Sequence, residues 1–286
     1  MRFEKWQALG NDYLILEREG LPFELTPERV RKLCEGHFGV YADGVLLLEK
    51  PSDPAYVAQL RIFNPDGSEA ELSGNGAREA ILYLRLRGWT DRDEFTILTD
   101  AGPIRPEITG PRTCRVQMGR ARLSSEHYPT GGPDGVGEVR SAGRSWRFQH
   151  VWIGNPQCAI HVPDIQELNA LELSEIGPEI EANELFPNRT NVSWFTEIGT
   201  GRLRARIFER GVGETLSSGT GATGAAVAHL QGNNGAGGGK MTVELDGGEL
   251  EVEVGENLDI ALTGWALPVF AGELSEDFLK ELHETE

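Results

Sequence analysis

Cysteine is scarce in this chain: the 286 residues include three, which lie far apart and form no CxxC pair. A structural zinc site needs closely spaced ligands, and the six histidines supply no HxH or HxxxH pair either. The sequence therefore predicts no metal site. An odd number of widely separated cysteines favours free, buried thiols in a reducing compartment.

Basic residues are also in the minority, because 27 Lys and Arg face 45 Asp and Glu and give a net charge of -18. Phosphate groups and anionic membrane surfaces attract clustered Lys and Arg, so we expect neither nucleic acid nor a membrane as partner. No window approaches the roughly 18 apolar residues of a membrane span, and the first residues contain no apolar signal region. These features predict a cytoplasmic globular protein.

The sequence does contain an internal repeat, half a chain apart. Residues 61–77 (RIFNPDGSEAELSGNGA) and 206–222 (RIFERGVGETLSSGTGA) align without a gap, and each copy ends in Ser-Gly-x-Gly-Ala. The repeat predicts two halves of similar fold that face each other across a pseudo-two-fold axis, with Ser73 and Ser218 on opposite walls of one cleft. The identical pairs are Arg61/Arg206, Ile62/Ile207, Phe63/Phe208, Glu69/Glu214, Ser73/Ser218, Gly74/Gly219, Gly76/Gly221 and Ala77/Ala222.

Short strand-like segments dominate the chain, and several alternate apolar and polar residues as half-buried strands do. The predicted strands are 13–17, 44–49, 57–63, 95–99, 115–118, 149–153, 159–162, 191–195, 202–208, 241–245, 249–254 and 258–263. Helices are predicted at 26–34, 74–87, 219–230 and 275–284. The segments between them predict a hairpin turn at 246–248, a connector or surface hairpin at 128–143 and a flexible glycine-rich loop at 232–239.

The helices at 74–87 and 219–230 are apolar on most faces, which predicts that each is buried and wrapped by its own sheet. The predicted fold class is α+β, with two pseudo-symmetric domains. Each is a mostly antiparallel sheet wrapped round a central helix, and the active site lies in the cleft between them. We place the N-terminal half at 1–118 plus 265–286 and the C-terminal half at 119–264.

Each Ser-Gly-x-Gly element places its serine at the entrance of a helix. The simpler interpretation is that Ser73 and Ser218 only cap these helices, because serine is among the best N-cap residues. However, the first N–H groups of a helix have no internal partner and bind anions well. Two matched serines flanking one carbon also suit removal of a proton from one face and its return to the other. The N–H groups that would clamp a carboxylate belong to Gly74, Asn75, Gly219 and Thr220.

A competing pattern is GxGxxG, which residues 219–224 match, with Glu244 about 20 residues later as in a dinucleotide fingerprint. Residues 213–218 before it do not read as a buried parallel strand, and the glycine-rich loop after the helix fits such a unit poorly. The sister copy has Glu79 where the third glycine would fall. We therefore predict no dinucleotide cofactor.

Several ordered motifs resemble those of the diaminopimelate epimerase family, the cofactor-independent amino-acid racemase group. They span nearly the whole chain and read LGNDY (9–13), ADG (42–44), FNPDGS (63–68), GNPQC (154–158), LFPNRTNV (185–192) and ERGVGET (209–215). The family counterparts of four of them are LGNDF, GADG, FNADGS and GNPHC. The resemblance implies an amino-acid substrate, no cofactor, a homodimer and an active site between two mirror-related domains.

The resemblance also implies a role for individual residues. The asparagines that would hydrogen-bond the amino and carboxylate groups of the substrate are Asn11, Asn64, Asn155 and Asn191. Arg210 would bind the distal carboxylate with two parallel hydrogen bonds, and Glu209 would accept a hydrogen bond from the reacting ammonium. Taken singly, any of these asparagines reads equally well as a turn residue, and Glu209-Arg210 as a solvated surface pair.

The chain departs from the family pattern at the reacting positions. In the family that the motifs resemble, cysteine occupies the positions of both Ser73 and Ser218, one as thiolate base and the other as thiol acid. A serine hydroxyl is far less acidic than a thiol and normally needs an adjacent base. Two further departures are Gln157, where the family has His, and Tyr41, where it usually has Gly. The glutamates close in sequence to the two serines are Glu71, Glu79 and Glu214.

Three explanations fit the paired serines. The chain is a natural serine variant that still epimerises, or it carries out another reaction on the same scaffold, or both cysteines were replaced in the laboratory. We predict a diaminopimelate-type epimerase that interconverts LL- and meso-2,6-diaminopimelate, in lysine and cell-wall precursor synthesis, with Ser73 and Ser218 at the acid/base positions. The alternatives are a fold-related lyase or isomerase, which uses a carboxylate as base, and an amino-acid-binding homologue that has lost the chemistry.

Overall fold

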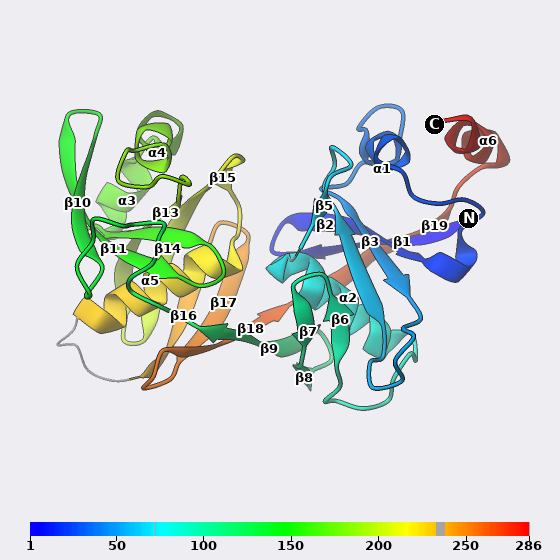
Figure 1. Ribbon diagram of the computed structural model, residues 1–286, viewed down its shortest axis with the longest axis horizontal. Coiled ribbons are helices and arrows are strands. Elements are labelled where there is room, and N and C mark those ends of the chain that lie inside the picture. Colours follow the sequence, from blue (N-terminus) through cyan, green and yellow to red (C-terminus); the bar gives the residue numbers. More distant parts are fainter. Residues whose placement is uncertain (72, 233–237, 286) are drawn as a thin grey trace. The chain divides into compact units, whose positions relative to one another are not determined.

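The computed structural model describes residues 1–71, 73–232 and 238–285, which Figure 1 colours along the chain. The chain divides into two compact units, Met1–Val116 with Gly264–Glu286 (unit 1) and Gln117–Thr263 (unit 2). Large β-sheets and a few helices make up the chain, which confirms the predicted α+β class. Residues 233–237 of the predicted glycine-rich loop lie outside the described residues.

Unit 1 is built on a sheet with the strand order β19-β1-β2-β3-β4-β6-β7, and β5 pairs with β4 off this path. The strands pair antiparallel except at β2–β3 and β4–β6, which are parallel. Its helices are α1 (Pro27–Cys34), α2 (Gly74–Leu86) and α6 (Glu276–Glu284). The strands are β1 (Arg2–Ala8), β2 (Asn11–Glu17), β3 (Val45–Glu49), β4 (Gln59–Phe63), β5 (Glu69–Ala70), β6 (Ile97–Thr99), β7 (Gly102–Ile104) and β19 (Leu267–Glu273).

The sheet of unit 2 has the order β10-β11-β12-β13-β14-β16-β17-β18, and β15 pairs with β14. The parallel pairs are β12–β13 and β14–β16. The helices are α3 (Ile165–Ala170), α4 (Leu173–Glu181) and α5 (Gly219–Gly232). The strands are β10 (Val136–Ser141), β11 (Arg144–Trp152), β12 (Pro156–His161), β13 (Asn191–Gly199), β14 (Arg202–Glu209), β15 (Gly213–Thr215), β16 (Gly239–Leu245), β17 (Gly248–Val254) and β18 (Asp259–Trp265).

The chain passes from one unit to the other twice. The first passage lies within β9 (Thr113–Arg120), which follows β8 (Pro106–Gly110), and the second lies within β18. Both β8 and β9 continue the larger sheet beyond β18. As a result, unit 1 is assembled from the two ends of the chain and unit 2 from its middle.

The two units repeat one topology. The order β1-β2-β3-β4-β6-β7 in unit 1 matches β11-β12-β13-β14-β16-β17 in unit 2, with parallel pairs at the same two places. A short strand, β5 or β15, pairs with the fourth strand of each set and leads into the central helix, α2 or α5. The 17-residue sequence repeat is therefore the best-preserved part of a duplication that covers most of the chain.

Each central helix is buried against its own sheet (Figure 1). Residues 75–84 of α2 and 221–228 of α5 are all buried, because small and apolar side chains surround both helices. Helix α2 contacts β1 to β4, and α5 contacts β11 to β14, β16 and β17. The predicted arrangement of a sheet round a central helix is confirmed.

The identical residues of the repeat have matching structural tasks. Arg61 Nε lies 2.7 Å from Glu69 Oε1 and links β4 to β5, and Arg206 Nη2 lies 2.6 Å from Glu214 Oε1 and links β14 to β15. Both pairs are partly exposed, so each contributes at most about 1 kcal/mol. Their position matters more than their strength, because they hold the short strand that precedes each Ser-Gly element.

Glycine is required at the second glycine of each element. A Cβ atom at Gly76 would lie 2.9 Å from Leu46 Cδ2, and one at Gly221 would lie 2.8 Å from Ile207 Cδ1. The missing side chain lets the first turn of each helix approach its sheet closely. The same approach fixes where the helix begins, and hence where the serine lies.

Several elements were not predicted. Strand β19 is exposed along most of its length and shows no alternation, and α4 contains Pro178 and Gly177, which argue against a helix. Segment 128–143 was predicted as a connector or surface hairpin; it contains β10, which forms a hairpin with β11, and the buried ring of Tyr128. The turn predicted at 246–248 joins β16 to β17.

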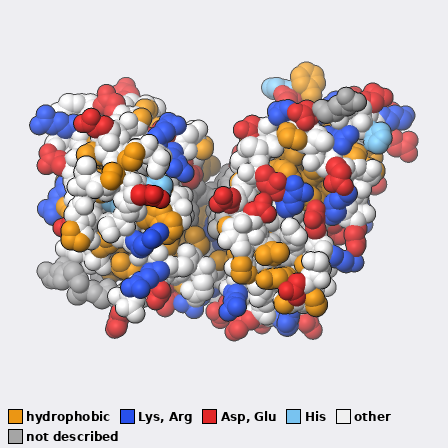
Figure 2. All heavy atoms as spheres, viewed as in Figure 1, with side chains coloured by type: hydrophobic (Ala, Val, Ile, Leu, Met, Phe, Trp, Pro, Cys, Tyr) orange, Lys and Arg blue, Asp and Glu red, His pale blue; other side chains and the backbone are white. Residues whose placement is uncertain are grey.

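The surface and the cysteines agree with the composition. Lys and Arg are interspersed with Asp and Glu on the face shown in Figure 2, and no basic patch stands out there. Cys34, Cys114 and Cys158 are free and buried. Within the described ranges, no helix is long and apolar enough to cross a membrane, and no group of His, Cys, Asp and Glu could hold a metal ion.

Gly44, immediately before β3, tests how closely this part of unit 1 is packed. A Cβ atom there would lie 2.3 Å from the Phe63 carbonyl oxygen and 2.6 Å from Tyr13 Cε1. We expect Gly44→Ala to lower the free energy of unfolding by about 1–3 kcal/mol, as overpacking does. Urea unfolding measures this, with Gly20→Ala of the same unit as control, because a Cβ at Gly20 meets nothing within 4 Å. Equal effects of the two changes would contradict the packing argument.

Candidate active site

Ser73 is the N-cap of α2 and has extended backbone angles, φ -125° and ψ 124°. Its Oγ accepts the backbone N–H of Gly76 at 3.1 Å and the hydroxyl of Tyr13 at 3.2 Å. The Ser73 oxygen is thus the acceptor in both contacts. The serine is half-buried.

An amide network fixes the surroundings of Ser73. Asn75 Nδ2 donates to Asn11 Oδ1 at 3.2 Å, and Asn11 Nδ2 donates to Asp43 Oδ2 at 2.8 Å. The guanidinium of Arg78 bonds Asn75 Oδ1. We call Ser73, Tyr13, Asn11, Gly74 and Asn75 the unit 1 half-site. Asn64 lies in a separate turn after β4, where its Nδ2 donates to Ser68 Oγ at 3.0 Å.

Ser218 occupies the equivalent place in unit 2. Its Oγ accepts the backbone N–H of Gly221 at 3.2 Å and lies 3.4 Å from Thr220 Oγ1. Asn155 Nδ2 contacts the same Thr220 hydroxyl at 3.3 Å, so Asn155 and Thr220 repeat the pairing of Asn11 and Asn75. Ser218 is buried, with 4% of its surface exposed. We call Ser218, Glu209, Asn155, Gly219 and Thr220 the unit 2 half-site.

Glu209 is the carboxylate beside Ser218. Thr215 Oγ1 donates to Glu209 Oε1 at 2.9 Å. Burial raises the pKa of the Glu209 carboxyl, and hydrogen bonds from Thr215 and Ser218 act in the opposite direction. A half-buried carboxylate beside a serine hydroxyl is the kind of adjacent base that a reacting serine needs. Glu209 lies 218 − 209 = 9 residues before Ser218, so it was not among the glutamates close in sequence to the serines. The sequence predicted it only as a partner of the reacting ammonium.

The glutamates that lie closer in sequence to the serines have other surroundings. Glu71 is exposed, and Glu214 pairs with Arg206. Glu79 is fully buried on α2 next to Arg78, which is 1% exposed. Burial raises the pKa of Glu79 well above its usual value, while Arg78 and the Tyr13 backbone N–H oppose this.

Asn191 and Arg210 are brought together at the start of β13 and the end of β14. Asn191 is buried; its Nδ2 donates to the Pro156 carbonyl at 3.1 Å, and its Oδ1 accepts the Arg210 backbone N–H at 2.9 Å. The Arg210 side chain is exposed, and Nη1 donates to the Asn188 carbonyl at 2.9 Å. Asn191 thus orients the backbone from which Glu209 and Arg210 extend.

Sequence reasoning missed a second support of this turn. Glu181 is buried at the end of α4, and its Oε1 accepts the Gly211 backbone N–H at 2.7 Å and pairs with Arg189 Nη2 at 2.6 Å. It also missed Tyr13 as the partner of Ser73 and Thr215 as the partner of Glu209. Both residues belong to the motifs LGNDY and ERGVGET, so the motifs contained the signal, although the contacts join residues that local patterns do not connect.

Of the two other departures from the family pattern, Gln157 contacts Asn155 of the unit 2 half-site, whereas Tyr41 contacts Lys5. Gln157 is fully buried, and its Nε2 donates to Asn155 Oδ1 at 2.7 Å. Tyr41 has a φ of 63°, in the left-handed region that favours glycine, and its ring is 58% exposed. Lys5 holds it in place, since Nζ donates to the Tyr41 carbonyl at 2.6 Å and lies 5.1 Å from the ring centroid.

All three cysteines are buried and lie away from the starts of the two central helices. Burial and the nearby Asp12 and Asp43 raise the pKa of Cys34 to about 12. Burial likewise raises the pKa of Cys114 to about 12, and that of Cys158 well above its usual value. The two half-sites therefore contain hydroxyl, amide and carboxyl groups and no thiol.

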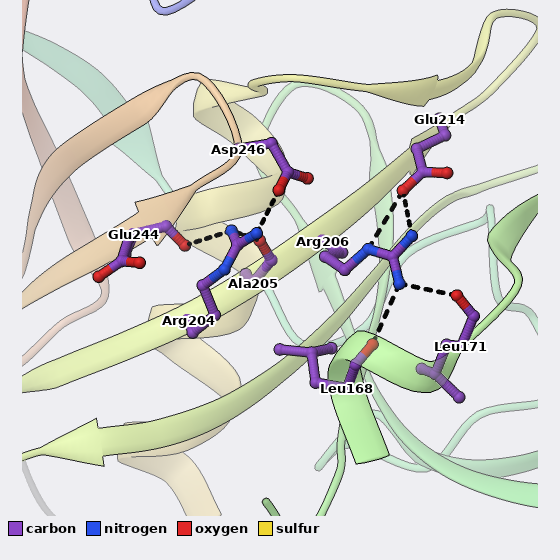
Figure 3. A network of polar contacts seen from close by, with 8 residues as sticks. All are labelled: Leu168, Leu171, Arg204, Ala205, Arg206, Glu214, Glu244 and Asp246. Atoms are coloured by element: carbon purple, nitrogen blue, oxygen red, sulfur yellow. Dashed lines mark hydrogen bonds and ion pairs between the residues drawn. The ribbon is translucent and has the colours of Figure 1, made fainter. Parts of the chain in front are cut away.

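Unit 2 also contains a hollow of ≈ 470 Å³, lined by Asn169, Arg204, Arg206, Glu214, Thr215, Leu216 and Asp246. Figure 3 shows its two guanidinium groups, and both already have partners. Arg204 bonds Asp246 and two backbone carbonyls, and Arg206 bonds Glu214 and the carbonyls of Leu168 and Leu171. The hollow therefore offers an anion little that is not already used, and we regard its arginines as structural.

Comparison with known proteins places the chain in a family. The sequence profile of a family described as diaminopimelate epimerase matches residues 3–124 and 150–266. A diaminopimelate epimerase of Pelotomaculum thermopropionicum is 40% identical over 282 residues, which cover 96% of this chain and 98% of that protein.

Two solved structures share the fold. A PhzF-family phenazine biosynthesis protein of Bacillus anthracis aligns with a TM-score of 0.68 at 17% identity, over 96% of this chain and 99% of that chain. A hydroxyproline epimerase of Agrobacterium vitis, with trans-4-hydroxy-L-proline bound, aligns with a TM-score of 0.67 at 16% identity, over 97% and 93%. At these identities the two structures establish the fold alone.

Glu79 generates a prediction for stability against pH. The pKa of Glu79 is raised in the folded protein above its ordinary value of about 4.5. The stability that the protonated carboxyl contributes is therefore fully present below about pH 4.5. It is lost as the pH rises through the pKa of Glu79 in the folded protein. Glu79→Gln does not titrate. We expect it to gain stability over the wild type as the pH rises above about 4.5, by up to about 1.4 kcal/mol per pH unit. Urea unfolding between pH 4 and pH 8 measures the difference, and a difference that does not vary with pH would contradict it.

Proposed function

Because the chain belongs to the diaminopimelate epimerase family, we propose that it interconverts LL- and meso-2,6-diaminopimelate in lysine biosynthesis. The reaction is a proton transfer at the α-carbon, in which one group removes the proton from one face and a second group supplies a proton to the other. The observation that carries the proposal is the duplicated element in which a serine caps the central helix of each unit.

We assign the acid and base positions to Ser73 and Ser218, and the two units to the two epimerase halves, 1–118 with 265–286 and 119–264. In this proposal one substrate engages both half-sites. The N–H groups at the helix starts hold the reacting carboxylate and stabilise the negative charge that develops beside it. These groups belong to Gly74, Asn75, Gly219 and Thr220.

The remaining residues fix the rest of the substrate. We assign the amino and carboxylate groups to Asn11, Asn64, Asn155 and Asn191, the reacting ammonium to Glu209 and the distal carboxylate to Arg210. The exposed guanidinium of Arg210 supports its assignment, because it can turn to a ligand at the cost of one hydrogen bond. Asn191 is the only buried one of these four asparagines, and its oxygen and one N–H already bond backbone groups.

Other parts of the proposal come from the resemblance alone. These are a reaction without cofactor, a homodimeric assembly and a location in the cytoplasm.

A second candidate is a lyase or another isomerase on the same fold, acting on a hydroxy- or amino-acid. The half-buried carboxylate of Glu209 near Ser218 favours it, because this carboxylate could act as the base directly. The shared fold does not separate the candidates, since proteins as different as a phenazine biosynthesis protein and a hydroxyproline epimerase have it. A third candidate is an amino-acid-binding protein without chemistry.

Exchange of the substrate α-proton in D₂O distinguishes the three candidates. Wash-in of deuterium with inversion at the α-carbon supports the epimerase. Tight binding of diaminopimelate without wash-in supports the binding protein, and loss of water from a hydroxy acid supports the lyase.

Restoring the thiols tests the acid/base assignment. We expect Ser73→Cys combined with Ser218→Cys to raise the epimerisation rate by about 10²-fold or more, because a thiol is far closer to neutral in pKa than a serine hydroxyl. The rate of inversion of LL-diaminopimelate measures this. The matched control is Ser193→Cys, a buried serine of unit 2 outside the half-sites. No gain from the double replacement would contradict the assignment of the two serines.

Arg210 tests the assignment of the distal carboxylate. We expect Arg210→Ala to remove the preference for a substrate with two carboxylates, because the variant has no guanidinium group there to bind the second carboxylate. Competition between diaminopimelate and a mono-acid analogue measures the preference. Arg189→Ala, which removes an exposed guanidinium from the same region, is the control. A preference that survives in Arg210→Ala would show that another group reads the distal carboxylate.

A further inference from the structure

The two capping serines have chemically different neighbours. Ser73 receives a hydrogen bond from a phenol, since Tyr13 Oη lies 3.2 Å from its Oγ. Ser218 instead lies near the Glu209 carboxylate, and its hydroxyl lowers the pKa of that carboxyl. A phenol can supply a proton and a carboxylate can take one, so the duplicated serines do not have duplicated chemistry.

Tyr13 is held firmly in its position. It lies in β2, its side chain is buried with 5% exposed, and its ring packs where Gly44 has no side chain. The backbone N–H of the same residue faces the buried Glu79 carboxyl. The hydroxyl is therefore aimed at Ser73 by a ring that the surrounding packing does not allow to turn away.

The corresponding position of unit 2 carries no hydroxyl. The segments Gly10-Asn11-Asp12-Tyr13 and Gly154-Asn155-Pro156-Gln157 match, because both glycines have positive φ, 86° and 81°, and both asparagines reach the second residue of the central helix. Tyr13 thus corresponds to Gln157, whose Nε2 donates to Asn155. The phenol is a feature of unit 1 only.

We propose that Tyr13 is a positioning and proton-supplying residue that acts through Ser73, and that it makes Ser73 the acid of the reaction while Glu209 makes Ser218 the base. The inference rests on the proposed function, because it requires both serines to reach one α-carbon. It explains how serine can stand at positions where the resemblance implies cysteine.

The proton balance of one turnover follows from these contacts. At the base, the α-carbon loses its proton to Ser218 Oγ, while the original hydroxyl proton of Ser218 passes to Glu209. At the acid, Ser73 gives its hydroxyl proton to the opposite face of the carbanion, and the Tyr13 hydroxyl proton passes to Ser73 Oγ. Glu209 ends protonated and Tyr13 ends as phenolate, and exchange with water resets both. The reverse reaction runs from that second form.

Tyr13→Phe tests the inference, because it keeps the ring and removes only the hydroxyl. We expect kcat for epimerisation to fall by about 10²-fold, the lower end of what one general acid contributes. The KM should stay within about twofold, since Tyr13 acts through Ser73 and not through the substrate. The matched control is Tyr83→Phe, another buried tyrosine of unit 1, whose hydroxyl bonds Glu17 at 2.7 Å, and it should keep full turnover.

Repeating Tyr13→Phe in the Ser73→Cys background separates proton supply from structure. A thiol does not need the phenol, so we expect less than about a twofold change in kcat there. An equal loss in both backgrounds, or a fall in the thermal midpoint beyond that of Tyr83→Phe, assigns a structural role to Tyr13 and overturns the inference. Unchanged kcat in Tyr13→Phe overturns it as well, while the proposed function stands. A wild-type chain that washes no deuterium into diaminopimelate removes the proposed function and the inference together.

Discussion

A serine oxygen that accepts the third backbone N–H of a helix is the interaction on which both half-sites depend. It satisfies one unpaired donor, and it places the hydroxyl beside the positive end of the helix dipole. The neighbouring glycine allows the first turn to lie close to the sheet, and the Arg–Glu pair holds the strand that precedes the serine. The cap and the candidate acid/base group are thus the same atom.

Duplication supplied two copies of this arrangement, and the later surroundings made them unequal. In unit 1, the Ser73 hydroxyl is surrounded by donors, namely Tyr13 and the helix N–H groups. In unit 2, the Ser218 hydroxyl lies near the Glu209 carboxylate, and desolvation raises the pKa of that carboxyl. An epimerase needs one group that gives a proton and one that takes it, so symmetry of fold together with asymmetry of neighbours suits the reaction.

The sequence predicted the parts of this structure that local patterns encode. The two central helices and most strands of the sheets followed from apolar periodicity, and the Ser-Gly repeat located both caps. Strand β19 was not predicted because its exposed residues do not alternate with buried ones. Helix α4 was not predicted because it contains Gly177 and Pro178. The contact between Tyr13 and Ser73 could not be read either, because it joins the second strand to a helix 60 residues later. Motifs identify which residues matter, whereas the fold decides which of them meet.

The strand β19 has a consequence for how the protein forms during synthesis. It pairs with β1, so that Arg2 lies opposite Glu273, and the Leu274 N–H bonds the Met1 carbonyl. The whole of unit 2, residues 117–263, is therefore synthesised before unit 1 can be completed. Strand β1 therefore has one edge unpaired until β19 is synthesised, and a chain that lacks β19 would leave that edge open to pairing with other chains.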